Sequence, residues 1–285
     1  MIQDEECFDL YAIKYASLRT TRSHTFLGGV SDDGPLDMAY YVWVAVSAKK
    51  TVLIDTGFSR ETALRRGRTW ERCPIDSLQL LGVSAGDVDD LIVTHLHYDH
   101  AGNIQKIPNA KIHVQQKEMQ FATSRYMCIK HISLGGIFEE EDVCTMVKNT
   151  FAGRVQFLEG DTVITPGIRT HLTGGHTPGM QMVSVKTKRG WVMLMSDAAH
   201  LYENIATQKP FHIAFDVADM VSGWRKAASI VETTDCLVPG HDPLVMEDYT
   251  PYSVATTGVI FRLDRAPVKS RLCTKEELLS SLPSV

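Results

Sequence analysis

Four side chains that commonly bind metal ions lie within six residues of one another in the first half of the chain. They are His95, His97, Asp99 and His100, in the stretch Thr-His-Leu-His-Tyr-Asp-His-Ala-Gly-Asn. Three imidazoles and one carboxylate suit Zn²⁺ or a similar borderline cation, which accepts nitrogen and carboxylate oxygen ligands. A lone histidine on a strand is usually packed or solvated, but that explanation has to account for all four residues together.

The backbone around this stretch is expected to bring several of these side chains to one point. The apolar run 91–93 predicts a short buried strand that ends just before His95. Side chains two residues apart on an extended chain point the same way, so His95 and His97 should project together. Asp99 would follow if the chain stayed extended, and a turn at Asp99 and His100 would swing His100 toward the same point.

Three further candidate ligands each follow an apolar stretch that predicts a strand. His176 follows 168–172, Asp197 follows 191–195 and His241 follows 236–238. Loops at the ends of strands cluster at one edge of a sheet, where sites are usually built. Glycines stand beside both histidines and let the backbone approach closely.

The elements that must position these residues predict a layered α/β architecture. Residues 41–46 and 51–54 predict a hairpin. Further strands are predicted over 91–94, 111–114, 155–158, 162–164, 168–172, 180–185, 191–195 and 236–238, and helices over 115–126 and 217–232. Alternating strands and helices indicate stacked sheets covered by helices on the outside, although the pattern alone does not determine the topology.

The segment 123–150 does not predict a regular element. It mixes apolar residues with the pair Gly135-Gly136 and the acidic cluster 139–142. A long insertion of this kind is often a lid or a binding loop. A pair of ordinary surface helices with a glycine break explains the composition equally well, as does an interface in a homodimer.

The composition is that of an ordinary globular protein. The chain has 285 residues, of which 44% are hydrophobic and 22% charged, and no linker-like tract divides it, so we expect one domain over 1–285. The net charge of −5 and the absence of a long basic run argue against a nucleic-acid partner. No apolar run is long enough to predict a membrane span.

The cysteines and the N-terminal residues favour a cytoplasmic protein. Six cysteines occur at irregular spacing without a Cys-x-x-Cys pair, which favours free thiols over a disulfide framework. The first residues are acidic and lack the basic start and apolar block of a signal peptide.

Taken in order, these motifs resemble those of the metallo-β-lactamase superfamily. That family carries HxHxDH, then a histidine, then an aspartate, then a histidine, and the sequence similarity extends from about residue 40 to about residue 245. Asp55-Thr56-Gly57, which follows the apolar stretch 52–54, also matches a common feature of the family. The resemblance implies a four-layer αββα sandwich with the metal site at one edge of the sheets.

The resemblance also implies a role for each candidate ligand. Two divalent metal ions would be bound, most simply Zn²⁺. The first would take His95, His97 and His176, the second would take Asp99, His100 and His241, and Asp197 would bridge the two. Asp55 would orient a ligand without touching a metal, or else it simply ends a strand in a turn.

Such a centre would hydrolyse a small-molecule substrate without a serine or cysteine nucleophile. Two metals roughly 3.5–4 Å apart share a hydroxide that is available at neutral pH, and this hydroxide attacks a carbonyl carbon. The metals then stabilise the charge that develops on the carbonyl and leaving oxygens. Asp99 is a candidate to carry a proton to the leaving group.

Within the superfamily, the chain is most similar to the N-acyl homoserine lactonases and related lactone hydrolases. Those enzymes usually carry a tyrosine three residues after the bridging aspartate, where this chain has His200. His200 is therefore a candidate catalytic residue that would donate a hydrogen bond to the substrate carbonyl, or a residue that only packs beside the site. We expect Tyr202 to pack. The resemblance implies that the substrate is a lactone ring, an N-acyl homoserine lactone or a similar compound. The departure at His200 bears on homoserine lactone specifically, more than on hydrolysis in general.

Other functions on the same fold remain as alternatives. The same hydroxide would attack another ester, a thioester or a cyclic amide. Iron-dependent oxidoreductases share the fold, but the flavin-linked type has a glutamate where His97 stands, and the mononuclear type does not use Asp99 and His100 as a full second site. No role is predicted for the other histidines, although His24 lies in the loop 19–37, which would border a pocket.

Overall fold

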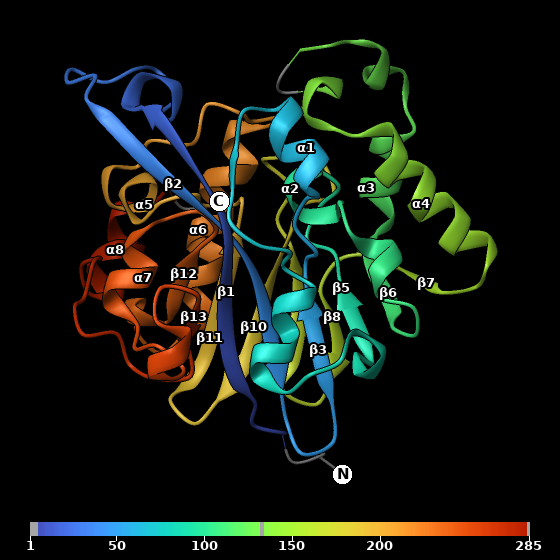
Figure 1. Cartoon of the computed structure of the whole chain (residues 1–285). Helices are drawn as coiled ribbons and strands as arrows, with labels where there is room; N and C mark the ends of the chain where they lie inside the picture. The colour runs from blue at the N-terminus through green and yellow to red at the C-terminus, as the bar shows by residue number, and fades with distance from the viewer. Residues whose placement is uncertain (1–4, 132–133, 284–285) are drawn as a thin grey trace.

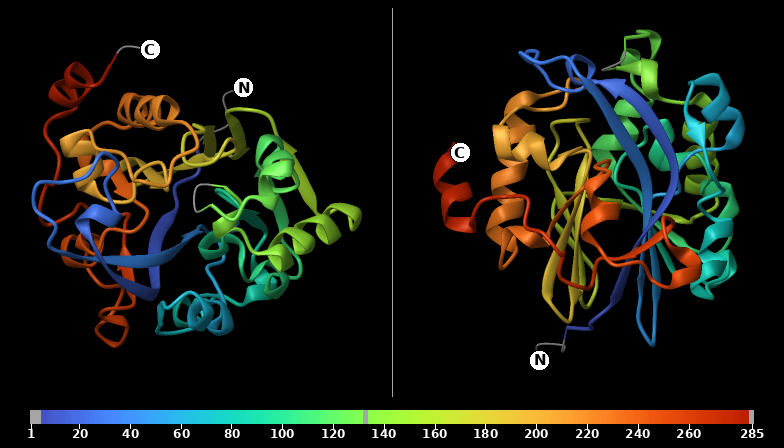
Figure 2. Two further views of the ribbon diagram at one scale, coloured as in Figure 1. Left: turned by 90° about the horizontal axis from the view of Figure 1, so that it is seen from above. Right: turned by 60° about the vertical axis from the view of Figure 1, so that its left-hand side comes forward.

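Two β-sheets pack face to face with helices on both outer faces (Figures 1 and 2). The structure, a computed structural model, describes residues 5–131 and 134–283. Within these residues the first sheet has eight strands, and its strand order is β13-β1-β2-β3-β5-β6-β7, with β4 paired to β1. The second sheet has five strands in the order β12-β11-β10-β9-β8. The predicted αββα sandwich is confirmed.

The strands of the two sheets have the following bounds. The first sheet contains β1 (Asp9–Thr21), β2 (Pro35–Val46), β3 (Thr51–Ile54), β4 (Thr69–Trp70), β5 (Asp90–Ile92), β6 (Lys111–Gln115), β7 (Val155–Leu158) and β13 (Ile260–Arg262). The second contains β8 (Thr162–Thr165), β9 (Ile168–Leu172), β10 (Gln181–Thr187), β11 (Gly190–Ser196) and β12 (Leu237–Pro239).

The helices fall into two groups along the chain. The first group is α1 (Arg60–Arg65), α2 (Tyr98–Ala101), α3 (Gln116–Ala122) and α4 (Glu140–Phe151). The second group is α5 (Tyr202–Thr207), α6 (Val217–Ile230), α7 (Leu244–Asp248) and α8 (Lys275–Ser281). The first group covers the outer face of the first sheet; in the second, α5, α6 and α8 contribute to the cluster on the outer face of the second sheet, whereas α7 packs at the edge between the sheets. Among the described residues, no helix combines the length and the apolar composition needed to cross a lipid bilayer.

Three apolar clusters correspond to the three interfaces of the four layers. On β2, Tyr40 and Val42 belong to the cluster under the first group of helices, whereas Tyr41 and Trp43 belong to the cluster between the sheets. Alternate residues of a strand point to opposite faces, so β2 is buried on both sides. The third cluster packs α6 against the outer face of the second sheet, with Trp224 among its fully buried members.

The regular elements largely confirm the sequence predictions, with one large omission. The predicted hairpin is β2 and β3, and the predicted helices correspond to α3 and α6, each ending earlier than expected. The pattern did not reveal β1, which pairs with β2 from Asp9 to Thr21. Because several consecutive residues of β1 are buried, the strand lacks the alternation of apolar and polar residues that marks a half-exposed strand.

The insertion 123–150 contains one regular helix, α4, preceded by short 3-10 turns. Residues 132 and 133 of this insertion lie outside the described residues. The Gly135-Gly136 pair is tightly packed, since a Cβ on Gly135 would lie 2.6 Å from the carbonyl oxygen of Met127. Glycine is therefore needed here for close packing as well as for its flexibility. All six cysteines are free thiols, as expected.

We predict that Trp224 contributes strongly to the free energy of unfolding, because its side chain is buried in an apolar cluster and also donates a hydrogen bond. Its ring is fully buried under α6, and its Nε1 donates to the carbonyl oxygen of Ala198, 2.6 Å away, in the loop after β11. Trp224→Ala should lower the free energy of unfolding by about 3–5 kcal/mol. Trp224→Phe, which keeps most of the packing, should cost about 1–2 kcal/mol. Urea unfolding followed by circular dichroism measures both.

The matched control is Phe151→Ala, because Phe151 is also aromatic but is 91% exposed. A surface change of this kind should alter the unfolding free energy by less than about 0.5 kcal/mol. Equal losses in the Trp224 and Phe151 variants would contradict the assigned role of the buried tryptophan.

Candidate metal centre

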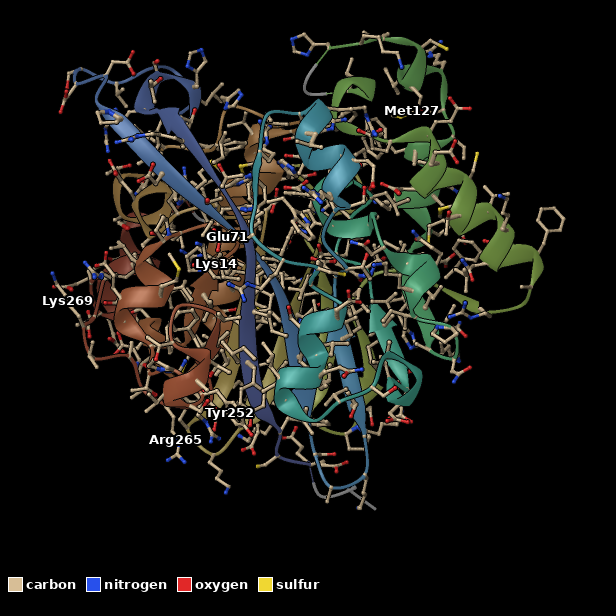
Figure 3. All side chains as sticks on the ribbon, in the orientation of Figure 1. Lys14, Glu71, Met127, Tyr252, Arg265 and Lys269 are labelled. Carbon is tan, nitrogen blue, oxygen red and sulfur yellow. The ribbon has the colours of Figure 1, made fainter. Side chains whose placement is uncertain are left out.

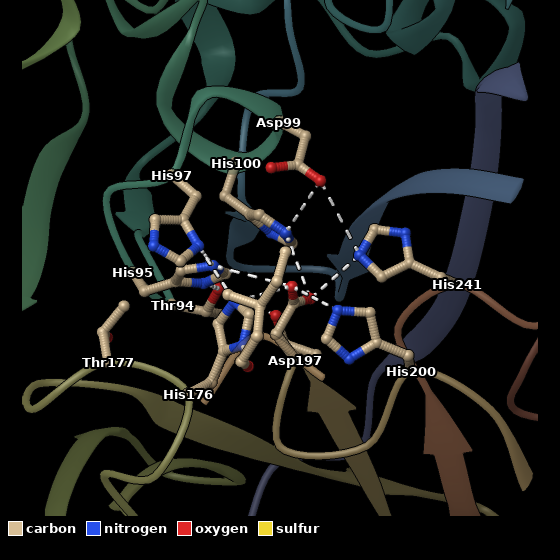
Figure 4. A network of polar contacts seen from close by, with 12 residues as sticks. Thr94, His95, His97, Asp99, His100, His176, Thr177, Asp197, His200 and His241 are labelled. Atoms are coloured by element: carbon tan, nitrogen blue, oxygen red, sulfur yellow. Dashed lines mark hydrogen bonds and ion pairs between the residues drawn. The ribbon is translucent and has the colours of Figure 1, made fainter. Parts of the chain in front are cut away.

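The seven side chains singled out by the motifs lie together at one edge of the two sheets (Figure 4). They form two groups, one of His95, His97, His176 and Asp197, the other of Asp99, His100, Asp197 and His241. Within each group the potential ligand atoms all lie within 4.8 Å of one another. Asp197 belongs to both groups, so its carboxylate stands where the two meet.

A loop and a helical turn bring His95, His97, Asp99 and His100 to the edge of the sheets. β5 ends at Ile92, and α2 begins at Tyr98 directly after His97. The chain does not stay extended as far as Asp99, because Asp99 and His100 lie in the first turn of α2, and this turn brings both side chains to the site. The helix packs closely here, since a Cβ on Gly102 would lie 2.8 Å from the carbonyl oxygen of Gly57.

The buried carboxylate of Asp55 contacts both the loop before His95 and the helix α2. It accepts hydrogen bonds from the backbone N–H of Thr94 at 2.7 Å and from the Thr94 hydroxyl at 2.8 Å, and it lies 2.7 Å from Nδ1 of His100. Burial raises the pKa of Asp55, and the contacts with His100 and Thr94 only partly oppose that shift. The backbone of Asp55 is left-handed, with φ of 61°. These contacts support the orienting role rather than that of a simple turn residue.

Backbone carbonyls orient two of the later histidines. Nδ1 of His176 lies 2.8 Å from the carbonyl oxygen of Ile213, and Nδ1 of His241 lies 3.0 Å from that of Ala39. Because a carbonyl only accepts, each Nδ1 carries a proton, and Nε2 is the nitrogen that remains for a metal ion. Nε2 of His176 and of His241 face opposite oxygens of Asp197, at 3.2 Å and 2.9 Å.

The nitrogen atoms of the first group are arranged to fit a cation. Nδ1 of His97 lies 3.0 Å from Nε2 of His95 and 2.9 Å from Nε2 of His176. Nδ1 of a neutral His97 carries either an N–H, which it can donate to only one neighbour, or a lone pair, which faces and repels the lone pair on Nε2 of His176. In both cases the nitrogen lone pairs are crowded together. A divalent cation among these nitrogens would remove that repulsion.

The electrostatics keep His95, His97 and Asp197 in the form that binds metal, whereas burial would lower the pKa of His100 and of His241 but the neighbouring carboxylates, Asp197 above all, raise it. Burial, and then the neighbouring imidazoles, lower the pKa of His95 and of His97 well below the usual value. Burial alone would raise the pKa of Asp197, but the surrounding histidines hold it well below its usual value. Neutral imidazoles and an ionised carboxylate are the states in which these side chains ligate. Nε2 of His100 is buried and has no hydrogen-bond partner among the described residues.

A cavity of about 250 Å³ opens onto the two groups. Its apolar walls are formed by Leu18, Met38, Ile137, Phe211 and Ile213, and its polar lining includes Tyr40, Arg68, Tyr98 and His24. His24 comes from the loop 19–37, so that loop does border the pocket. Ile137 comes from the insertion 123–150.

His200 lies inside the site, whereas Tyr202 does not line the cavity. Nε2 of His200 lies 3.0 Å from the Asp197 carboxylate, and its ring stacks on Phe211 with 3.5 Å between centroids. Burial lowers the pKa of His200 to about 3, so the ring is neutral at pH 7. Tyr202 packs in the cluster between the sheets, as expected.

Glu118 is a buried residue of this region that the motifs did not reveal. Its carboxylate accepts from the N–H of Leu96, the hydroxyl of Thr177 and the N–H of Gly179. It thereby joins the loop of His95 and His97 to the loop of His176. Gly179 has no room for a side chain, since a Cβ would lie 2.2 Å from the backbone nitrogen of Glu118.

Comparison with known proteins agrees with this geometry. The profile of the metallo-beta-lactamase superfamily matches residues 36–241. An N-acyl homoserine lactonase of Bacillus sp is 26% identical over 223 residues, which cover 73% of this chain and 82% of the relative.

Solved structures share the fold. A quorum-quenching N-acyl homoserine lactone lactonase has a TM-score of 0.69 at 23% identity, covering 85% of this chain and 95% of that one. AidC, a dizinc quorum-quenching lactonase in complex with its product, has a TM-score of 0.65 at 20% identity, covering 85% and 92%. Since the family profile spans most of the chain and the strands form the expected sandwich, the chain belongs to the metallo-beta-lactamase superfamily.

Proposed function

We propose that this protein is a dinuclear metal-dependent hydrolase that opens a lactone ring. The observation that carries the proposal is the position of Asp197, whose two carboxylate oxygens face different histidine groups. One oxygen lies 3.2 Å from Nε2 of His176, and the other lies 2.9 Å from Nε2 of His241. A carboxylate held in this way is suited to bridge two cations.

The ligand sets follow from the two groups. His95, His97 and His176 would hold one divalent cation, Asp99, His100 and His241 would hold the other, and Asp197 would bridge both. Nitrogen and carboxylate oxygen suit Zn²⁺. Two such ions supply a hydroxide at neutral pH and a Lewis acid that polarises a carbonyl oxygen.

Two side chains of the cavity would assist the reaction. Asp99 lines the cavity, and its carboxylate lies 3.6 Å from Nε2 of His100 and 3.8 Å from Nε2 of His241. From there it can take a proton and deliver it to the leaving oxygen. Neutral His200 also lines the cavity, and its single N–H faces the Asp197 carboxylate at 3.0 Å. To assist the reaction, this N–H would turn from Asp197 to the substrate carbonyl oxygen and donate a hydrogen bond there.

The substrate class is supported by the cavity and by the relatives. A small cavity with apolar walls suits a ring ester with an apolar portion. The Bacillus relative is named a lactonase, and AidC is described with N-hexanoyl-L-homoserine as its product. Because His200 stands where those enzymes usually have tyrosine, we infer that the preferred ring differs from homoserine lactone. Other esters, thioesters and cyclic amides are the comparison substrates.

We predict that the purified protein binds two zinc-like ions per chain, which follows from the two-metal arrangement. Removal of the ions with a chelator should abolish hydrolysis of lactones, and Zn²⁺ should restore it. Asp197→Asn should lose most of the metal and nearly all turnover. Elemental analysis and a pH-indicator assay with lactones, thioesters and cyclic amides measure these outcomes.

Asp87→Asn is the matched control, because Asp87 is an exposed carboxylate that lies outside the two ligand groups. It should keep its metal and its activity. A metal-replete Asp197→Asn variant with unchanged turnover would refute the bridging role, and an absence of hydrolysis across the panel would refute the substrate class.

We predict that His200→Ala keeps its metal content but lowers kcat by about a hundredfold, the usual effect of removing one hydrogen bond to a developing oxyanion. His200→Gln, which restores an N–H donor, should recover part of the loss. Tyr202→Phe serves as control, because Tyr202 packs between the sheets and should leave turnover unchanged. Full activity of His200→Ala would assign His200 to packing alone.

A further inference from the structure

The cavity contains a positive charge, on Arg68, that forms no ion pair with a carboxylate of the described residues. Arg68 lines the cavity and is half-buried. Within residues 5–131 and 134–283, no aspartate or glutamate oxygen lies within 4.0 Å of its guanidinium. By contrast, the half-buried Arg66 pairs with Glu139, and Arg271 pairs with Asp248. An unpaired charge in a partly desolvated position is costly unless something compensates it.

The guanidinium is held by neutral groups that leave part of it free. Nε of Arg68 donates to the Tyr98 hydroxyl at 2.9 Å, and Nη1 donates to the backbone carbonyl of Arg66 at 2.7 Å. The Tyr98 hydroxyl in turn lies 3.2 Å from that of Tyr40. Phenols are neutral at pH 7. Nη2 makes no hydrogen bond to any residue that the structure describes, so part of the fork is available to a ligand.

The backbone around Arg68 is anchored, so its side chain starts from a fixed position. Arg68 directly precedes β4, and β4 pairs with β1 through Trp70 opposite Ala16. Just beyond β4, Glu71 forms an ion pair with Lys14 of β1, and the two side chains lie beside each other in Figure 3. A guanidinium on a fixed segment loses little freedom when it binds a ligand.

The proposed metal ions do not neutralise Arg68 either. The carboxylate whose charge acts on Arg68 most directly within the site is Asp99, which belongs to the second ligand group. Two divalent cations carry more positive charge than Asp99 and Asp197 carry negative charge. The floor of the cavity and the side wall at Arg68 therefore both favour an anion.

We propose that Arg68 binds a carboxylate of the substrate, so that the preferred substrates are ring esters that carry an acidic group apart from the bond that breaks. This inference rests on the proposed function and specifies its substrate. A guanidinium with no carboxylate partner and a free Nη2 favours a carboxylate over a neutral carbonyl, because the hydrogen bond from Nη2 is then charge-assisted. The apolar walls at Leu18 and Met38 would contact the rest of the ring system.

The test compares phthalide, a neutral ring ester fused to benzene, with its ring-substituted carboxylic acids and the matching carboxamides. For the zinc-loaded protein, at least one carboxylic acid should have a kcat/KM roughly ten- to a hundredfold above its carboxamide, the usual value of a charge-assisted hydrogen bond. Arg68→Gln should remove that preference, measured as the ratio of the kcat/KM of each acid to that of its carboxamide. Arg68→Lys should retain part of it, because lysine keeps the charge but not the fork.

Arg65→Gln is the control, because Arg65 lies in the same segment, is largely exposed and does not line the cavity. It removes the same charge and should keep the preference. Binding gives a second measurement that does not depend on turnover. Titration calorimetry compares two ring-opened products: hydroxymethylbenzoate, which comes from phthalide and has one carboxylate, and the product of the phthalide carboxylic acid, which has two. The second should bind the zinc-loaded protein more tightly, and Arg68→Gln should abolish the difference.

The outcomes separate this inference from the proposed function. If phthalide is hydrolysed but no acid exceeds its carboxamide, or if Arg68→Gln keeps the preference, the role of Arg68 is refuted and lactone hydrolysis stands. If no ring ester is hydrolysed, lactone hydrolysis is refuted. In that case the role of Arg68 is judged from binding alone: it is supported if the product with two carboxylates binds more tightly and Arg68→Gln removes the difference, and refuted otherwise.

Discussion

The site depends on one buried carboxylate that is surrounded by imidazoles. Asp197 follows β11 and lies within 3.2 Å of nitrogen atoms from His100, His176, His200 and His241. A single carboxylate at full burial would be costly without partners, and here the histidines compensate it. The strands that end at this edge bring those histidines to one point, so the order of the strands in the two sheets determines which side chains meet at the site.

A small set of polar contacts fixes the positions of the loops that carry the candidate ligands. Asp55 binds Thr94 and His100, and Glu118 binds the loops on both sides of the first ligand group. His241 is joined to Ala39 of β2 by two contacts, one through its ring and one through its backbone. Because such supports fix the orientation of a ligand before a cation arrives, they lower the cost of forming the site.

Much of the fold and of the candidate site could be predicted because short apolar strands end next to chemically distinctive residues. The motif from His95 to His100, and the turns around His176 and His241, are visible as local patterns. Glu118 and Arg68 were missed because their roles depend on distant partners, such as Thr177 and Tyr98. β1 was missed because burial on both faces removes the alternation that identifies a strand.

The long antiparallel pair β1 and β2 separates recognition from metal binding. The link from β2 to His241 uses backbone atoms of Ala39, whereas the neighbouring side chains of Leu18 and Met38 form the cavity wall. Exchanging those side chains alters what the cavity accepts without disturbing the backbone that holds the histidine. Substitutions at Leu18 and Met38 should therefore change the shape of the cavity one residue at a time, while the two contacts that hold His241 are kept.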